Sequence, residues 1–159
     1  MRALILFLFF GIGIHKNQSV EETYQFKPLL NHKNALQESK QNKKLTLLYF
    51  SAYGSVICEM MKENVFGDAN IKSLLKQKYC SFKAMVDDKT PIPKAEQYIS
   101  KLDKKPVLTV GARSIDIQVS VLKTNIQPYF VIIDENGKQI RHLVGKTNAK
   151  DFLKFLVGK

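Results

Sequence analysis

The chain has 159 residues, which is enough for one domain with a sizeable core and too short for two ordinary domains. Apolar residues make up 45% of it, so a folded protein is predicted. The formal net charge of +11 favours anionic surfaces, but the lysines are scattered and lack the aromatic interleaving of single-strand binders, so nucleic-acid binding is not predicted.

The first 14 residues form a separate segment. Met1-Arg2 is a minimal basic start, and an uncharged apolar run follows from Ala3 to Ile14. This run is short for a bilayer span, which needs about 20 residues, but it fits the hydrophobic region of a signal peptide. We therefore expect residues 1–14 to be a signal peptide, or else an uncleaved anchor, followed by a polar lead-in over 15–27. The protein is then exported, and it meets a membrane only through an uncleaved N-terminal segment.

The domain proper is expected over residues 28–159 and opens with a helix and a strand. Residues 28–41 have the spacing of an amphipathic helix, with Pro28 in its first turn. Residues 45–50 are continuously apolar apart from Thr46, which is typical of a strand covered on both faces.

Helical stretches and a second strand follow. A helix is predicted from 55 to about 64, and residues 68–78, with Asp68 as an N-cap, continue or restart it. Apolar residues alternate with polar ones over 79–86, which predicts a strand. Because helices connect this strand to the one before it, the two should run parallel.

The middle of the chain gives weaker signals. Residues 87–93 contain two prolines and predict a turn, and 94–101 predict a short helix. Residues 103–113 are expected to be a loop. Residues 114–125 fit both an alternating strand pattern and a helical stripe, and their β-branched content leans toward a strand.

The last third predicts a hairpin and a closing helix. Residues 128–134 form a clear strand, Asn136-Gly137 supplies the turn, and 139–145 return antiparallel. Thr147 or Asn148 caps a final helix. The whole order predicts an α/β fold with a mixed central sheet flanked by helices on both faces.

Cysteines and histidines indicate neither a disulfide nor a metal site. Cys80 lies at the start of its strand, whereas Cys58 follows the end of the parallel neighbour, so about 20 Å separate them, and a disulfide needs Cα atoms within about 7 Å. His15, His32 and His142 have no ligand spacing with one another or with the cysteines. Two free thiols, no metal and no cofactor are predicted.

The motif Ser55-Val56-Ile57-Cys58 stands between a buried strand and a helix start, the place of a Cys-x-x-Cys redox motif. The stretches 47–66, 86–90 and 127–137 resemble the thioredoxin family. More narrowly, they resemble the thioredoxin-like domain at the C-terminal end of bacterial thiol:disulfide interchange membrane proteins, and its free-standing relatives. The resemblance implies a thioredoxin fold, a helix over 114–125, and a bacterial periplasmic or secreted protein.

The resemblance also assigns roles to positions. In active members the residue at 55 is the attacking cysteine and the residue at 58 is the more buried resolving cysteine. The proline at 128 is cis, and the backbone before it pairs with a bound peptide or partner strand. A cis X–Pro bond costs only about 0.5–1 kcal/mol, so Gln127-Pro128 can adopt it.

Three departures from the family pattern bear on function. Position 55 is serine, which cannot form a disulfide but is a preferred N-cap for the N–H of Cys58. Position 49 is tyrosine, where active members commonly carry a buried acid that accepts protons. Tyr53-Gly54 precedes the motif where a tryptophan is usual, and the chain has no tryptophan.

Two hypotheses follow. In the first, the protein is a redox-inactive binding module for a peptide or protein partner, held in a groove at the cis-proline. The groove residues would be Tyr53, Gly54, Ser55, Val56, Ile57, Gln127 and Pro128. In the second, Cys58 acts as the catalytic residue of a thiol-disulfide oxidoreductase, at most a weak one, or as a monothiol acceptor.

Overall fold

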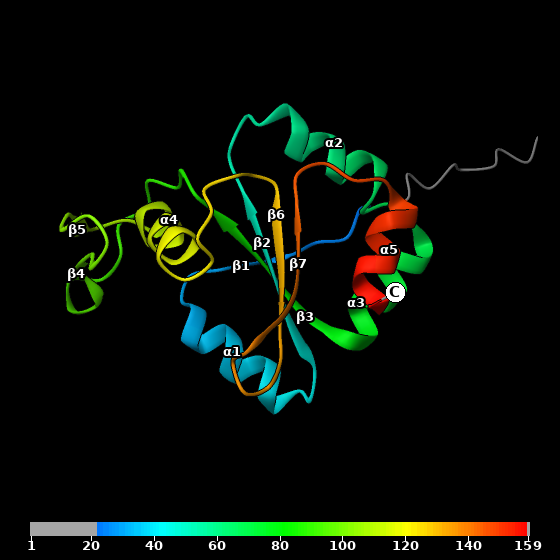
Figure 1. Cartoon of the computed structure of the whole chain (residues 1–159), viewed down its shortest axis with the longest axis horizontal. Helices are drawn as coiled ribbons and strands as arrows, with labels where there is room; N and C mark the ends of the chain where they lie inside the picture. The colour runs from blue at the N-terminus through cyan, green and yellow to red at the C-terminus, as the bar shows by residue number, and fades with distance from the viewer. Residues whose placement is uncertain (1–21, 159) are drawn as a thin grey trace, which may run out of the picture.

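A computed structural model describes residues 22–158 (Figure 1). The predicted signal peptide or anchor, residues 1–14, lies outside the described residues. Within the described part, no helix is long and apolar enough to cross a membrane. The elements run in the order β1 (Lys27–Pro28), α1 (His32–Gln41), β2 (Leu45–Ser51), α2 (Val56–Asn64), α3 (Ala69–Lys78), β3 (Tyr79–Met85), η1 (Lys94–Glu96), β4 (Tyr98–Ile99), β5 (Pro106–Val107), α4 (Val110–Ser120), β6 (Tyr129–Ile133), β7 (Gln139–Val144) and α5 (Ala149–Val157).

The main sheet has five strands in the order β1-β3-β2-β6-β7. β1, β3 and β2 are parallel, β6 is antiparallel to β2, and β7 is antiparallel to β6. This confirms the predicted parallel pair, the C-terminal hairpin and the mixed sheet. β2 lies at the centre of the sheet, so both of its edges are paired with neighbouring strands.

Alternate residues of β2 point into two separate cores. Leu47 and Tyr49 pack with α2, α3 and α5 on one face of the sheet, whereas Leu48 and Phe50 pack with α1 and α4 on the other. All four side chains are buried. Two covered faces explain why the strand is continuously apolar rather than alternating. The predicted helices on both faces are confirmed.

The N-terminal helix begins later than predicted. The sequence pattern predicts a helix from residue 28, but the backbone N–H of Leu29 donates to the carbonyl of Lys83 at 2.8 Å, so this stretch joins the sheet as β1. Asn31 then caps α1, its side chain accepting the N–H of Lys33 at 3.0 Å. The edge pairing with β3 is long-range, and the local pattern does not contain it.

The described end of the predicted lead-in packs on the domain. The N–H of Tyr24 donates to the carbonyl of Phe66 at 2.9 Å. Phe26 meets the Tyr24 and Phe66 rings edge-on, with ring centroids 5.0 Å apart in both pairs. Residues 22–27 therefore contribute to the core that covers the α2 side of the sheet.

The predicted helix over 94–101 is wrong. A short 3-10 turn, η1, is followed by β4, which pairs with β5 in a separate two-stranded ribbon. The side chains of Tyr98 and Ser100 both donate to the Asp116 carboxylate on α4. These tertiary bonds hold residues 98–100 extended against the next helix, which overrides a weak local helical pattern.

The ambiguous stretch is a helix, as the family resemblance implies, but it begins earlier and ends earlier than expected. α4 starts at Val110, within the predicted loop over 103–113, and the Thr109 hydroxyl accepts the N–H of Ala112 at 3.1 Å. Gly111 looked like a loop residue. A Cβ at residue 111 would lie 2.5 Å from the backbone nitrogen of Asp88, so glycine lets this helix start pack against the turn after β3.

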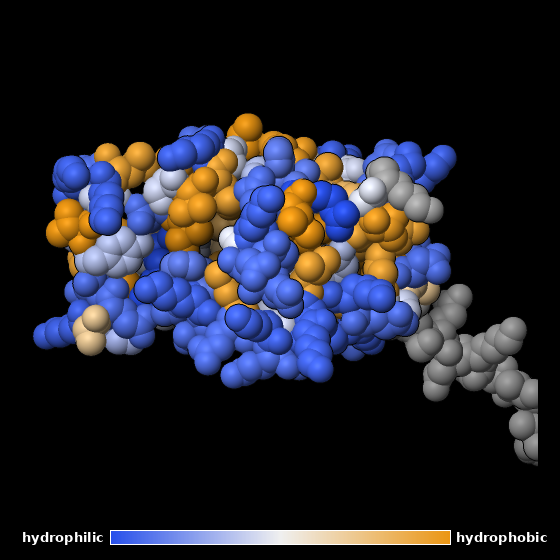
Figure 2. Space-filling view, turned by 60° about the horizontal axis from the view of Figure 1, so that its bottom comes forward, coloured by the Kyte–Doolittle hydropathy of each residue, from blue (hydrophilic) through white to orange (hydrophobic). Residues whose placement is uncertain are grey.

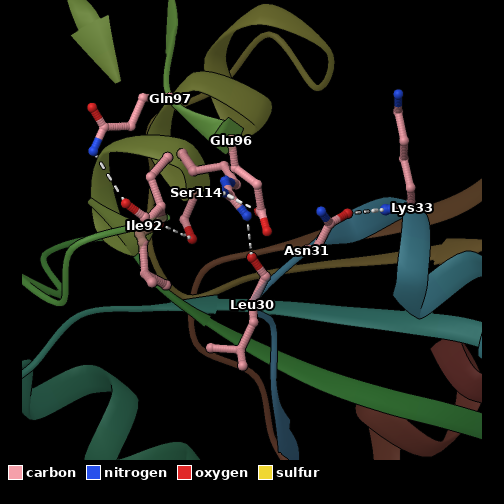
Figure 3. A network of polar contacts seen from close by, with 9 residues as sticks. Leu30, Asn31, Lys33, Ile92, Glu96, Gln97 and Ser114 are labelled. Atoms are coloured by element: carbon pink, nitrogen blue, oxygen red, sulfur yellow. Dashed lines mark hydrogen bonds and ion pairs between the residues drawn. The ribbon is translucent and has the colours of Figure 1, made fainter. Parts of the chain in front are cut away.

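A buried arginine ties this region to α1, and Figure 3 shows its two acceptors, the Leu30 carbonyl and the Glu96 carboxylate. The Arg113 side chain, on α4, donates to the carbonyl of Leu30 at 2.6 Å and to the Glu96 carboxylate at 2.8 Å. One side chain thus joins the start of α1, the η1 turn and α4.

Candidate functional site

The β2–α2 junction is built as the sequence predicts. β2 ends at Ser51 and α2 begins at Val56, with Ser55 extended as its N-cap. The Ser55 hydroxyl oxygen accepts the backbone N–H of Cys58 at 3.4 Å, and its carbonyl accepts that of Glu59 at 3.0 Å. The serine hydroxyl therefore satisfies one donor at the helix start that lacks an intrahelical partner, and the serine carbonyl accepts the first intrahelical bond.

An acidic residue after β3 positions the loop before the motif. The backbone N–H of Tyr53 lies 3.0 Å from each carboxylate oxygen of Asp87 and donates to them. Gly54 then takes φ +66, a left-handed conformation that glycine adopts without strain. From the sequence, Asp87 is predicted only to lie in a turn. A long-range partner for it gives no local signal, because the two residues meet only once β2 and β3 pair.

The proline loop lies beside this junction. β2 and β6 are antiparallel with Phe50 opposite Tyr129, so the end of β2 and the start of β6 share one end of the sheet. The Gln127-Pro128 peptide bond is cis. Residues 52–58 and 127–128, far apart in sequence, are thereby brought together at the top of Figure 1.

Gln118 holds the proline loop from α4. Its side-chain amide donates to the carbonyl of Ile126 at 2.8 Å, and its amide oxygen accepts from the Gln127 side chain at 2.8 Å. The Gln118 side chain is fully buried. The sequence did not predict this residue, because α4 buries the polar Arg113, Ser114 and Gln118 and no apolar stripe marks its inner face.

The predicted groove residues differ sharply in exposure. Tyr53, Val56 and Ile57 are 63%, 73% and 45% exposed, and Gly54 is exposed as well. Ser55 and Gln127 are half-buried and Pro128 is buried. Cys58 is only 2% exposed. The junction thus presents an apolar surface and keeps its sulfur beneath it.

The Cys58 thiol lies among hydroxyl groups rather than charges. Burial raises the pKa of this thiol, but the hydroxyls of Ser51 and Ser55, the backbone of Ala52 and the Tyr49 hydroxyl outweigh burial and hold the pKa below its ordinary value. Together these four groups are called the thiol cage. Every member favours the ionised sulfur as a hydrogen-bond acceptor.

Two hydroxyls of the thiol cage have no other hydrogen-bond partner. The buried hydroxyls of Tyr49 and Ser51 make no hydrogen bond. Burial, first of all, raises the pKa of Tyr49 far above its ordinary value, so its phenol stays protonated. A buried donor without a partner costs free energy, and a thiolate at Cys58 would supply the missing acceptor.

The two cysteines are free, as predicted. Cys80 pairs with Thr46 at the beginning of β2, whereas Cys58 lies in α2 beyond the other end of that strand. The strand length that separates them excludes a disulfide. Among residues 22–158, no three side chains of histidine, cysteine, aspartate or glutamate gather as a metal site would require.

Comparison with known families gives one decisive match. A model of the thioredoxin-like domain matches residues 32–157, which is most of the chain. The chain belongs to the thioredoxin family. A comparison with curated proteins finds no match.

Solved structures show the same fold in other members of the family. A thioredoxin from Thermus thermophilus aligns with a TM-score of 0.59 at 18% identity, covering 86% of each chain. DsbH oxidoreductase aligns with a TM-score of 0.59 at 16% identity, covering 93% of this chain and 94% of its own. The oxidised C-terminal domain of Neisseria meningitidis DsbD aligns with a TM-score of 0.51 at 13% identity, covering 85% and 98%.

Within the thioredoxin fold, this chain keeps the geometry and changes the chemistry. The helix start, the cis peptide bond and the buried thiol are all in place. Residue 55, the attacking position that the family resemblance implies, carries an oxygen that serves as a helix cap. A dithiol–disulfide cycle between positions 55 and 58 therefore has no chemical basis in this chain.

Proposed function

We propose that this thioredoxin-family protein is a non-catalytic binding module that holds an extended peptide of a partner protein between residues 53–57 and Gln127-Pro128. The observation that carries the proposal is the contrast in exposure: Tyr53, Val56 and Ile57 face solvent, while the sulfur of the motif is buried. Exposed apolar side chains beside an irregular backbone segment suit an extended ligand, which pairs through its backbone and places side chains against them.

Peptide binding is tested with a defined probe. The probe is the insulin B chain with S-carboxymethylated cysteines, an apolar extended peptide without thiols, and the readout is the fluorescence anisotropy of the labelled probe. Val56→Ser should weaken binding about fivefold, because a buried valine contributes roughly 1–2 kcal/mol more than a serine. The matched control is Val157→Ser at the end of α5, which should bind as the wild type does. Equal affinity in both variants would reject the groove.

Redox inactivity is tested separately with insulin reduction by dithiothreitol. Wild type should show no acceleration, and Ser55→Cys should show it, since the variant restores two thiols at the helix start. Acceleration by the wild type that disappears in Cys58→Ala would instead favour thiol chemistry.

A second candidate function is favoured by the thiol cage. Cys58 could act as a monothiol acceptor: its thiolate attacks one sulfur of a partner disulfide, a Cys58–partner disulfide forms, and the partner's other sulfur leaves as a thiolate. Within residues 22–158 no second thiol lies nearby to resolve it, so an external thiol must do so. A mixed disulfide seen by mass spectrometry after incubation with oxidised insulin, absent in Cys58→Ala, supports this candidate.

We also propose that the protein is exported. It rests on the uncharged run Ala3 to Ile14, which has the length of a signal-peptide core. N-terminal sequencing of the protein recovered from the periplasm and the medium of a bacterial host tests it. Recovery of the intact chain from the cytoplasm alone would reject it.

A further inference from the structure

The segment between β3 and α4 carries a feature that the proposed function does not use. β4 and β5 pair as a separate ribbon, with Tyr98 opposite Val107, and the residues between them close a tight hairpin. This ribbon stands at one end of the molecule, on the left in Figure 1, away from the main sheet. Residues 98–106 are called the hairpin tip.

The hairpin tip is fixed by hydrogen bonds centred on Ser100. Its backbone N–H donates to the carbonyl of Lys105 at 2.8 Å, and its carbonyl accepts from the N–H of Lys104 at 3.1 Å. Its hydroxyl oxygen accepts the N–H of Leu102 at 3.1 Å and donates to the Asp116 carboxylate on α4. The tip therefore has a defined shape before any partner binds.

That shape presents apolar side chains to solvent. Ile99 and Leu102 are 58% and 52% exposed. Leu102 also borders a shallow hollow of about 190 Å³ between the tip and α4. The apolar residues that line the hollow are Leu102, Pro106, Val107, Ala112 and Ile115.

Lysines alternate with these apolar residues. Lys101, Lys104 and Lys105 are all exposed, and the acid among them is Asp103, which pairs with the Lys105 ammonium at 3.7 Å. Figure 2 shows apolar patches set among hydrophilic ones at the left end of the molecule, where β4 and β5 lie. The tip therefore combines a local excess of positive charge with projecting apolar groups.

We propose that the hairpin tip binds an anionic lipid bilayer, with Ile99 and Leu102 in the interfacial region and the neighbouring lysines on the headgroups. Lipid fits the shape, because the tip projects outward from the domain and its exposed apolar side chains can enter the boundary between headgroups and acyl chains. Lipid also fits the charge, since each lysine near an anionic leaflet adds to the attraction.

The hairpin tip lies far from the point at which the described chain begins. The described chain begins at Glu22, whose carbonyl accepts from the Lys72 ammonium on α3. α3 lies on the right in Figure 1, at the opposite end of the molecule from the hairpin tip. Substitutions in the tip therefore test its membrane contact without altering residues 1–21.

The test is sedimentation of the full chain with vesicles of phosphatidylcholine, with and without phosphatidylglycerol. Wild type should bind the anionic vesicles more tightly, and salt should reduce the difference. The double variant Ile99→Ser/Leu102→Ser should bind at least about tenfold more weakly, and Lys101→Gln/Lys104→Gln about thirtyfold more weakly. Matched controls at the far end, Val157→Ser and Lys150→Gln, should bind as the wild type does.

Insertion is read directly from a single tryptophan, because the chain has none. The emission of Leu102→Trp should shift to the blue with anionic vesicles, and that of Val157→Trp should not. Three results would overturn the proposal: no vesicle binding by the wild type, equal binding to neutral and anionic vesicles, or unchanged binding in both tip variants. The last result would assign the membrane contact to residues 1–21, and retention on soluble polyglutamate without vesicle binding would assign the tip to an acidic protein.

Discussion

The backbone N–H of Tyr53 donates to both carboxylate oxygens of Asp87, at 3.0 Å each. The two residues lie 34 positions apart in the chain, in the loops that follow β2 and β3. Because these strands are parallel and adjacent, their carboxyl ends meet, and the loop after one can be held by a side chain after the other. The exposed face of the candidate groove therefore depends on a residue outside it.

Asp87→Ala should release that loop. A hydrogen bond to a charged group contributes about 1.5–3 kcal/mol, so the variant should lose about 1–2 kcal/mol of unfolding free energy, given its partial exposure. Probe binding should weaken together with hydrogen-exchange protection at Tyr53. Urea unfolding and hydrogen exchange measure both effects, with Asp103→Ala in the hairpin tip as the control. Unchanged exchange at Tyr53 would show that the carboxylate does not hold the loop.

The thiol cage predicts how Cys58 titrates. Burial raises the pKa of Cys58, but the hydrogen-bond donors of the thiol cage lower it by more. The folded pKa of Cys58 therefore lies below its unfolded value. The stabilisation from this ionised thiol is then fully present above the unfolded pKa, and it is lost as the pH falls through the folded pKa. The unfolding free energy of wild type relative to Cys58→Ala should therefore rise with pH across this window.

Removing one hydroxyl should move the titration upward. In a Cys80→Ala background, Ser51→Ala should shift the pH midpoint of Cys58 alkylation to higher pH, because the ionised sulfur loses a donor. Rates are followed by mass spectrometry of the folded protein. Ser81→Ala removes another buried hydroxyl without a hydrogen bond, one that lies on β3, and serves as the control. A midpoint unchanged by Ser51→Ala contradicts the cage.

Tyr49→Phe should raise the free energy of unfolding by an amount that depends on pH. The Tyr49 hydroxyl is buried without a hydrogen bond, so removing it at low pH, where the thiol is neutral, should raise the unfolding free energy by about 1 kcal/mol. The gain should shrink at high pH, where the thiolate can accept this donor. Thr46→Val also removes a buried hydroxyl that lacks a partner, and its gain should not depend on pH. Chemical denaturation at two pH values distinguishes the variants.

Arg113 should control the region that carries the hairpin tip. Arg113→Ala leaves the Leu30 carbonyl without its donor and opens a void, so a loss of about 2–3 kcal/mol is expected. Glu96→Gln should cost less than about 1 kcal/mol, because Glu96 is well exposed and its ion pair is screened. Hydrogen exchange should increase over residues 91–109 in Arg113→Ala alone. Equal losses in both variants would mean that the ion pair, not the backbone bond, anchors the region.

The sequence by itself determined the order of the elements from α1 to β3 and from β6 to α5, the Ser55 cap, the parallel and antiparallel pairs, and the separation of the two thiols. These features follow from local periodicity, capping chemistry and strand length, all of which depend on residues that are close together in the sequence. The same residues excluded a dithiol cycle, since a serine oxygen cannot enter a disulfide.

Only the tertiary structure decided what surrounds those residues. The cage around Cys58 joins Tyr49 and Ser51 of β2 to the start of α2, and Asp87 and Gln118 reach the site from distant segments. Residues 94–101 became a turn and a strand because Asp116 binds their side chains. In this last case two long-range hydrogen bonds outweigh a local helical preference of less than about 1 kcal/mol per residue, and such bonds form only when the fold brings their partners together.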